Sequence, residues 1–316
     1  AYEITYGDWI QTCALPICQI YQLGVFQYVT VKAMLDSMEN PLLPVVIQVK
    51  AAPPWTIKTG IGYGMEERLR LLVDIRKRSF LGVARRLDLY LKHSSLEPYS
   101  IDLRITQFGF PAPQTSLLLN PFFLRQQEPG FTVDRTGVNI AHQQRFATYT
   151  DGSLRYTLEQ DYLKVSALTR EQTLDSSRIA LYHKSYFTLA MARDNSLPLF
   201  YPRKGLYTAA TVTWAGVGFQ SDFHFLRLLG EVRHYQRVGR TSVLATRIKA
   251  GSLRRLGPDR FTPIEERFFT GGASSVRGWG HSEIGPKNSA GLPIGGNSLL
   301  ELGVELRREW AGPISG

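Results

Sequence analysis

The side chains best suited to catalysis or metal binding in this 316-residue chain are six histidines and two cysteines. The histidines show no His-x-x-x-His spacing, and no Gly-x-Ser-x-Gly motif for a serine nucleophile occurs. Cys13 and Cys18 stand five apart without a second pair, which disfavours a zinc site and leaves a disulfide or free thiols. We therefore predict no metal, no cofactor and no enzymatic activity. The alternative is a serine–histidine pair assembled from neighbouring strands.

A glycine-rich stretch surrounds the most distinctive charged residue. Residues 267–286, RFFTGGASSVRGWGHSEIGP, hold five glycines and three aromatic residues around Arg277. Glycine permits positive φ angles and close backbone approach, so the stretch is expected to fold back against another part of the chain. An arginine presents five donors in a rigid fork, which suits a fixed pairing with a carboxylate. The alternative is a surface turn with a solvated arginine.

A second glycine pattern, GIGYG, begins at Gly60. It lacks the Gly-Lys-Ser/Thr ending of a nucleotide-binding loop, so we do not interpret it as one. Alternation instead places Gly60, Gly62 and Gly64 on one face of a strand, with Ile61 and Tyr63 on the other. Glycine weakens a strand and removes side-chain interlocking, so such a strand should pair loosely with a neighbour. A plain strand with small residues on its inner face is the alternative.

The elements that must position these residues alternate apolar and polar side chains. In residues 86–92, RLDLYLK, three leucines take one face, and residues 100–106 and 299–307 repeat the pattern. In the last of these segments Glu305 falls on the polar face. This period of two predicts β-strands. Twelve strands are expected, near residues 57–65, 68–78, 84–94, 99–109, 115–125, 132–144, 153–164, 178–192, 205–217, 223–237, 241–251 and 297–310.

This strand pattern predicts a mainly β fold, a transmembrane antiparallel β-barrel. Segments of about ten residues with an apolar face and a charged face match outer-membrane barrel strands around a wet lumen. The strands of a soluble sandwich, the alternative, are usually shorter. No uninterrupted apolar window reaches the length of a membrane helix. The net charge of +10 contains no run of five like charges, so we assign it to the barrel interior and predict no nucleic-acid partner.

The N-terminal part of the chain has a different pattern. Residues 19–52 mix a short helical piece, QIYQLGVF, with strand-like YVTVKAML and PVVIQVK, and the turn-rich AAPPW follows. This order predicts a small α/β module joined by a linker to the barrel, which takes residues 56–316. Residues 1–18 fit neither part and form a segment of uncertain origin.

Three stretches resemble the BamA/TamA family of outer-membrane assembly factors. Residues 19–55 look like part of a POTRA domain that runs into the first barrel strand. Residues 193–205, RDNSLPLFYPRKG, are similar to the approach to the family's ninth strand. The glycine-rich stretch and the following GLPIGGNSLLELGVELR resemble the long inward sixth loop, here residues 252–296, with its VRG(F/Y) motif. Its glycines look closer to TamA-like members than to BamA.

The resemblance implies roles for individual residues. Arg277 corresponds to the motif's arginine and Glu305 to a carboxylate on the following strand, so the two would form a latch that holds the loop in the lumen. The other motif residues are Gly271, Gly272, Val276, Gly278 and Trp279, the last standing where the family has Phe or Tyr. The first barrel strand would act as a lateral gate, through Thr59, Gly60, Ile61, Gly62, Tyr63 and Gly64. A family barrel has sixteen strands, so about four, with a second acidic partner for the arginine, would lie beyond this chain.

The function implied by the resemblance is conformational. The protein would act as an insertase or translocase in the outer membrane of a Gram-negative bacterium, with the POTRA domain in the periplasm. Its partners would be unfolded outer-membrane protein clients, a bilayer containing lipopolysaccharide, and in addition a protein of the inner membrane or periplasm. A two-partner-secretion transporter and a passive porin-like channel are the alternatives.

Overall fold

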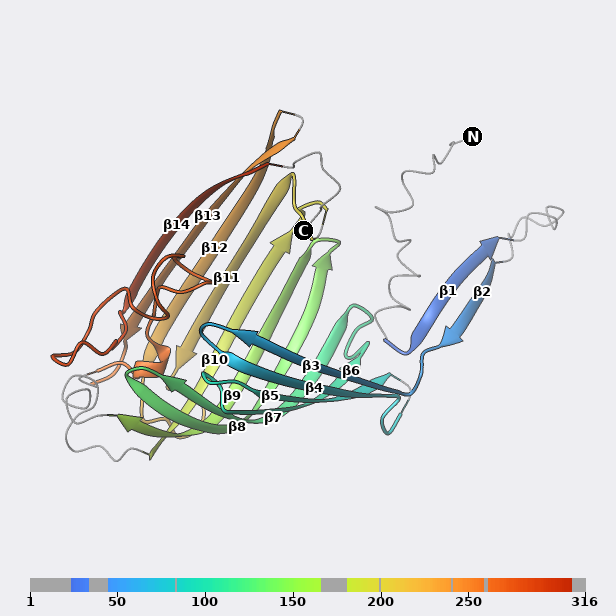
Figure 1. The fold of residues 1–316 in the computed structure, drawn as a ribbon. Helices are drawn as coiled ribbons and strands as arrows, with labels where there is room; N and C mark the ends of the chain where they lie inside the picture. Colours follow the sequence, from blue (N-terminus) through green and yellow to red (C-terminus); the bar gives the residue numbers. More distant parts are fainter. Residues whose placement is uncertain are drawn as a thin grey trace.

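The computed structural model describes residues 24–33, 45–82, 84–165, 181–198, 200–239, 241–258 and 261–308. Two antiparallel strands, β1 (Phe26–Ala33) and β2 (Val45–Ala51), form a small sheet. Twelve further strands form one large sheet whose order follows the chain from β3 to β14. Figure 1 shows the large sheet curving round like a barrel wall.

The strands of the large sheet are long, and each pairs antiparallel with its sequence neighbours. Their bounds are β3 (Trp55–Gly64), β4 (Arg68–Arg78), β5 (Arg85–His93), β6 (Tyr99–Phe108), β7 (Thr115–Glu128), β8 (Phe131–Ala147), β9 (Thr150–Val165), β10 (Leu181–Asp194), β11 (Gly205–Ala215), β12 (Phe225–Val238), β13 (Ser242–Arg255) and β14 (Ser298–Arg308). The predicted mainly β fold and its twelve strands are confirmed. Consecutive antiparallel strands need only short turns, which is why the chain can build this sheet in sequence order.

The predicted strand ends differ from the observed ones by a few residues. The hairpin of β8 and β9 extends at both strands, continuing beyond residue 144 to a tight turn between Ala147 and Thr150. Its last rungs include Arg145 opposite Asp151, and the guanidinium donates to the carboxylate over 2.9 Å. A cross-strand ion pair supports pairing although it interrupts the apolar alternation, so the pattern alone ended these strands too early.

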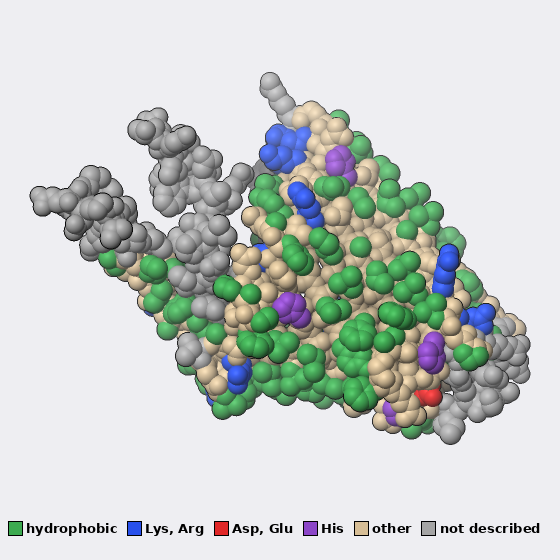
Figure 2. All heavy atoms as spheres, turned by 180° about the vertical axis from the view of Figure 1, so that it is seen from behind, with side chains coloured by type: hydrophobic (Ala, Val, Ile, Leu, Met, Phe, Trp, Pro, Cys, Tyr) green, Lys and Arg blue, Asp and Glu red, His purple; other side chains and the backbone are tan. Residues whose placement is uncertain are grey.

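The two faces of the sheet differ in polarity. On β14 the four outward residues Leu300, Leu302, Val304 and Leu306 are 69–73% exposed, whereas Glu301 on the opposite face is buried. Figure 2 shows hydrophobic side chains spread over the face in view among uncharged side chains and backbone, with only scattered Lys, Arg and His. An apolar exterior around a polar interior is the distribution expected of a barrel wall in a lipid bilayer. Within the described ranges, no helix is long and apolar enough to cross a membrane.

The N-terminal strands meet the large sheet at β4. Arg78 donates to the carbonyl of Gly24 over 3.0 Å and to that of Pro53 over 2.9 Å, which fastens the end of the sheet where β1 begins and β2 ends to the wall. The helical prediction for QIYQLGVF is wrong over its described part. Gly24 has a φ of +64°, Val25 accepts a hydrogen bond from Ala52, and Phe26 begins β1. Pairing with β2 therefore overrides the local helical pattern.

Several predictions for the N-terminal module lie outside the described residues. These are the segment 1–18 with both cysteines, the first part of the helical piece at 19–23, and residues 34–44 between β1 and β2. The two strand-like pieces of the module are confirmed as β1 and β2, and its assignment as a POTRA domain stays a prediction.

The large sheet has two rims, which we call proximal and distal. The proximal rim carries the junction with β2, and the distal rim carries the β3–β4, β5–β6 and β7–β8 turns. A long loop, residues 256–297, leaves the distal rim after β13 and returns at β14. The sequence placed its start at residue 252, but residues 252–255 belong to β13, where Ser252 pairs with Ser298. Figure 1 shows this loop lying away from β1 and β2.

Candidate functional site

The long loop is folded against itself by bridges between its two halves. Phe268 pairs with Gly296, Thr270 with Ile284, and Lys287 with Pro293. We call residues 261–270 the stem of the loop and residues 271–284 its tip. The predicted backfolding is thus observed, and the tip and stem contact different parts of the wall.

The motif glycines serve backbone geometry at the start of the tip. Gly271, Gly272 and Gly278 have φ angles of +107°, +98° and +93°, a region that disfavours residues with a Cβ. A Cβ on residue 271 would also lie 2.5 Å from the carbonyl oxygen of Gly280. Any larger residue at position 271 would therefore disturb the tip through both strain and collision.

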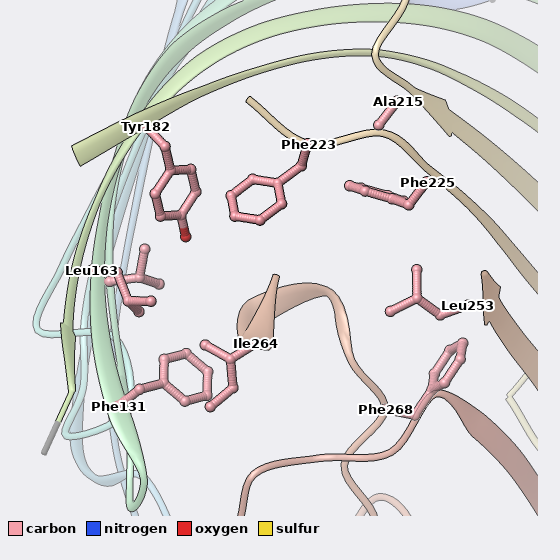
Figure 3. Close-up of a cluster of buried hydrophobic side chains, with 10 residues drawn as sticks. Phe131, Leu163, Tyr182, Ala215, Phe223, Phe225, Leu253, Ile264 and Phe268 are labelled. Atoms are coloured by element: carbon pink, nitrogen blue, oxygen red, sulfur yellow. The ribbon is translucent and has the colours of Figure 1, made fainter. Parts of the chain in front are cut away.

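The stem is held first by apolar packing. Its single-turn 3₁₀ helix, η3 (Ile264–Glu266), directs a fully buried Ile264 into the distal end of the barrel. Figure 3 shows Ile264 beside Phe131, with aromatic side chains from neighbouring strands gathered around it. The cluster comprises Phe131, Val133, Leu163, Tyr182, Ala215, Phe223, Phe225, Leu253, Ile264 and Phe268. Burying an isoleucine in such a cluster contributes roughly 1.5–3 kcal/mol.

Four carboxylates surround a buried lysine beside this cluster. The Nζ of Lys184 on β10 lies 2.8 Å from Glu159 and 2.8 Å from Asp161, both on β9. The same nitrogen lies 2.9 Å from Glu265 and 3.1 Å from Glu266 of the stem. We call these five residues the lysine cluster. Since the lysine is fully buried, it binds the stem to the wall without competition from bulk water.

Two arginines and two tyrosines complete the environment of the lysine cluster. Arg227 donates to the carbonyl of Glu266 over 3.1 Å, and Arg135 lies 3.7 Å from the Glu266 carboxylate. The hydroxyls of Tyr182 and Tyr186 donate to Glu265 and Glu159 over 2.8 and 3.2 Å.

These neighbours set the charge state of the stem carboxylates. Burial acts to raise the pKa of Glu266, but Lys184, Arg135 and Arg227 outweigh it and lower that pKa to about 2. Burial also opposes ionisation of Glu265, yet Lys184 and Arg135 keep its pKa below the ordinary value. Both stem carboxylates are therefore ionised at neutral pH, and the stem carries two negative charges into a recess where the wall supplies Lys184, Arg135 and Arg227 together with two carboxylates of its own.

The tip is held by an exposed ion pair to β14. Arg277 donates to the carboxylate of Glu305 on β14, so the structure brings together the two residues of the predicted latch. Arg307 donates to the other oxygen of the same carboxylate over 3.0 Å. The side chain of Arg277 is 71% exposed, and Trp279 is also exposed. The pair is observed, and its role as a latch stays a prediction.

Further contacts fasten the tip to β13 and β14. Ser275 donates to Glu301 over 2.5 Å, and Arg247 donates to the carbonyl of Ser274 over 3.2 Å. Between the tip and the wall lies a cavity of about 570 Å³, lined in part by Val276 and Arg277. Of the contacts that hold the tip, the Arg277–Glu305 pair is solvent-accessible and contributes little to stability, whereas the hydrogen bond to Glu301 is buried.

The predicted gate strand is β3, and its faces are those expected. Gly60 and Gly62 lie opposite Leu72 and Arg70 of β4, while Ile61 and Tyr63 point outward and are 79% and 76% exposed. Thr59 shares the outward face and Gly64 the inward one. Within the described residues β3 pairs only with β4. Its role as a gate stays a prediction.

The interior next to the stem is polar. A cavity of about 610 Å³ lies on the inner face, lined by charged and polar side chains that include Arg86, Asn120, Arg155 and Glu266 of the stem. Next to it, Asp88 accepts hydrogen bonds from both Arg76 and Arg86 over 2.6 Å. Over the described part of the chain, no group of three or more His, Cys, Asp or Glu residues is placed to hold a metal ion.

The lysine cluster is the part of the site that sequence reasoning missed. Glu159 and Asp161 are ordinary alternating residues of an inward strand face, and Glu265 and Glu266 read as a solvated pair in a loop. One signal was available, because a lysine and two acids at inward positions of adjacent predicted strands can meet across a hairpin.

The sequence and the fold were compared with known proteins. Residues 79–311 match the family model described as the Omp85 superfamily domain. A SAM50-like protein of Schizosaccharomyces pombe is 25% identical over 272 residues, which cover 84% of this chain and 56% of that protein. The outer membrane protein assembly factor BamA of Nitratidesulfovibrio vulgaris is 28% identical over 105 residues, 33% of this chain and 13% of that one. The chain thus spans about half the length of the first of these relatives.

Solved structures with the same fold were also found. The crystal structure of BamA from Haemophilus ducreyi lacking POTRA domains 1–3 has a TM-score of 0.79 at 18% identity, covering 95% of this chain and 61% of that one. CdiB from Acinetobacter baumannii has a TM-score of 0.54 at 12% identity, covering 93% of this chain and 54% of that one. At these identities the likeness is one of fold.

Proposed function

The chain belongs to the Omp85 superfamily, and we propose that it is the barrel part of an outer-membrane insertase that assists assembly of other β-barrel proteins. Support comes from the relatives, one named as an outer membrane protein assembly factor and another as SAM50-like. The proposed activity is conformational, with no covalent chemistry and no cofactor. The proposed clients are unfolded outer-membrane proteins, with autotransporter-type proteins among them.

The single observation that carries the proposal is the make-up of β3, the first strand of the large sheet, whose inner face has glycine at residues 60 and 62. We propose that, when the outer edge of this strand is unpaired, its row of N–H and C=O groups takes up an extended client by strand addition. Gly60 and Gly62 leave its inner face without side chains that interlock with a partner strand. An incoming client strand can therefore add to β3 and be displaced again with little steric resistance.

The surroundings proposed for the protein are an outer membrane and its adjoining aqueous compartment. We propose a Gram-negative bacterium, with the β1–β2 module on the periplasmic side as part of a POTRA domain and lipopolysaccharide in the facing leaflet. A protein of the inner membrane or periplasm would bind that module. We also propose that the chain is closer to the TamA-like members of the family than to BamA. The relatives come from both a bacterium and a eukaryote, so the host membrane is part of what must be tested.

Secretion of a single polypeptide through the lumen is the second candidate function. The fold likeness to CdiB favours it at the level of architecture, although with a lower TM-score than the likeness to BamA. A passive porin is disfavoured, because the stem fills the distal end of the barrel with an apolar cluster and buried charges. A steady open channel would need that end to be hydrated.

The test uses the natural full-length protein in liposomes and measures the rate at which a urea-denatured barrel client inserts. The double substitution Gly60→Val and Gly62→Val should slow insertion several-fold, because valine strengthens β3 and interlocks with a partner strand. Both sites have room, since an added Cβ comes no closer than 3.6 Å to Leu72 and 3.4 Å to Arg70.

The matched control is Gly230→Val on β12. An added Cβ there would meet only the carbonyl oxygen of Ala209, at 4.0 Å, and β12 pairs with β11 on one side and β13 on the other. It should fold and insert clients at the normal rate. Equal insertion rates for the β3 double variant and the wild type would remove the gate mechanism. A wild-type protein that exports one polypeptide but inserts no client would favour the secretion alternative.

A further inference from the structure

The tip of the loop also reaches the wall at a second place, at the ends of β7 and of the β3–β4 hairpin. His281 places Nε2 2.9 Å from an oxygen of Glu128, the last residue of β7. Its Nδ1 lies 3.8 Å from Glu66, in the turn between β3 and β4. Ser282 adds a hydrogen bond to Glu128 over 3.3 Å. We call Glu66, Glu128 and His281 the second anchor of the tip.

Glu66 also binds the backbone of the tip directly. The N–H of Ala273 donates to Glu66 over 2.7 Å. The preceding residue is Gly272, and a Cβ there would lie 2.7 Å from the same carboxylate oxygen. The glycine therefore provides more than a turn, since only a residue without a side chain lets Glu66 approach the tip so closely.

The electrostatic environment favours a charged imidazole in the second anchor. The hydrogen bond to Glu128 raises the pKa of His281, with smaller contributions from the charges of Glu66 and Glu67. Glu67 is itself paired with Lys92 over 3.0 Å and with Arg70 over 3.0 Å. On the loop's own side, Glu283 accepts a hydrogen bond from the N–H of Gly280.

The tip thus touches two parts of the sheet that are far apart in strand order. Glu66 belongs to the hairpin of β3, the first strand of the large sheet, and Glu305 belongs to β14, the last strand described. The β3–β4 turn is also held by the neighbouring β5–β6 turn, where Ser95 donates its backbone N–H to the carbonyl of Glu67 over 3.0 Å and its hydroxyl to the carbonyl of Glu66 over 2.9 Å. Through Glu66 the tip adds a second restraint on this turn, and with it on the motion of β3.

We propose that the tip is a strut between the β3–β4 hairpin and the β13–β14 wall, and that release of the second anchor frees the β3 edge. Glu66 and Glu128 act as positioning residues in this scheme, and His281 connects them to the loop. The existence of the strut follows from the contacts alone. Its consequence for client insertion rests on the function proposed above.

The experiment measures the separation of the two ends of the strut in the natural full-length protein, reconstituted in lipid nanodiscs. Spin labels replace Met65 in the β3–β4 turn and Leu302 on β14, both of which are well exposed. The double substitution Glu66→Gln and Glu128→Gln should broaden the distance distribution, because a charge-assisted contact is lost on each hairpin. Proteolysis between residues 271 and 284 should rise about three- to tenfold.

The control is Glu97→Gln in the β5–β6 turn. Glu97 pairs with the same Lys92 at the same rim but makes no contact with the loop among the described residues. It should leave the distance distribution and the proteolysis unchanged. Should the double variant fail to fold, Glu66→Gln alone keeps the test open, since Glu128 still pairs with His281.

Acidity gives an independent readout. Raising the pH from about 6 to about 9 should loosen the wild-type tip, because a histidine whose folded pKa is raised loses its stabilising charge as pH rises through that value. His281→Gln should be loose at both pH values. The strut would be overturned if the distance distribution were the same for the wild type, the Glu66/Glu128 double variant and Glu97→Gln at both pH values.

Client insertion separates the strut from its proposed consequence. Faster insertion by the Glu66/Glu128 double variant supports release of β3 as the step that the strut controls. A loosened tip with an unchanged insertion rate overturns that coupling. A wild-type protein that inserts no client overturns the proposed function, while the distance measurement still decides the strut.

Discussion

The stem and the tip of the long loop are held to the same barrel wall by opposite physical means. The stem uses buried groups, with Ile264 in an aromatic cluster and Lys184 enclosed by carboxylates. The tip uses Arg277, which is largely exposed, and His281, which is partly exposed. The difference indicates that the stem is a fixed foundation for the loop, whereas the tip can exchange its contacts with water.

This division agrees with a loop that must stay in the barrel while part of it moves. Buried ion pairs resist removal of one partner, since the remaining charge is left without solvent. Exposed pairs can break at little cost because water replaces the partner. Substitutions in the stem and in the tip should therefore differ in their effect on stability.

The largest effect is expected from Lys184→Met in the stem. The substitution leaves four buried carboxylates without their central cation and should lower the free energy of unfolding by roughly 3–5 kcal/mol. Denaturant unfolding of the full-length protein in lipid measures the change. Lys92→Met is the matched control, because Lys92 pairs with two carboxylates but is partly exposed, and it should cost about 1 kcal/mol or less. Similar losses in the two variants would contradict a fixed stem.

The next largest effect is expected from Ile264→Ala. Removing this side chain opens a cavity among Phe131, Leu163 and Phe225, which should cost roughly 2–5 kcal/mol. The same unfolding measurement applies, with protease sensitivity of residues 261–270 as a second readout. Leu256→Ala, an exposed position of the same loop, should change stability by no more than about 0.5 kcal/mol. A neutral Ile264→Ala would show that the apolar cluster does not fix the stem.

The response to pH should distinguish the two regions. Glu266 has a folded pKa lowered to about 2, so its stabilisation is present above an ordinary pKa of about 4.3 and is lost only as pH falls through about 2. His281 has a raised pKa, so its contribution is present below about 6.5 and is lost as pH rises through the folded value. Limited proteolysis should find the stem protected from about pH 4 to pH 9, with the tip loosening at the alkaline end. Simultaneous loosening of both would argue against separate attachments.

The smallest effect on global stability is expected from Arg277→Ala. Because its guanidinium is exposed, the loss should be about 1 kcal/mol or less, and Glu305 keeps Arg307 as a partner. Proteolysis of residues 271–284 should nevertheless increase, while the stem stays protected. Arg307→Ala is the control, since it removes the arginine of the wall and leaves the tip contact in place. An unchanged tip in Arg277→Ala would reduce the motif to a turn.

Much of the wall was predictable because period-two alternation is a local property. Leu87, Leu89 and Leu91 share a face in the sequence and pair on one face of the sheet. The glycines of the loop and the pairing of Arg277 with Glu305 were also predictable, the latter from a motif together with the inward side of an alternating strand. The helical reading of the segment before Phe26 failed, because pairing with β2 outweighed a short local pattern.

The sequence by itself determined the strands, their inward and outward faces, and the glycines at which the loop must turn, because each follows from neighbours in the chain. Only the tertiary structure decided that Lys184 meets Glu265 and Glu266, and that His281 reaches Glu66 and Glu128. These partners come from strands and a loop that are distant in sequence. Their meeting depends on the curvature of the sheet and the depth to which the loop enters it, and neither quantity is written in any local pattern.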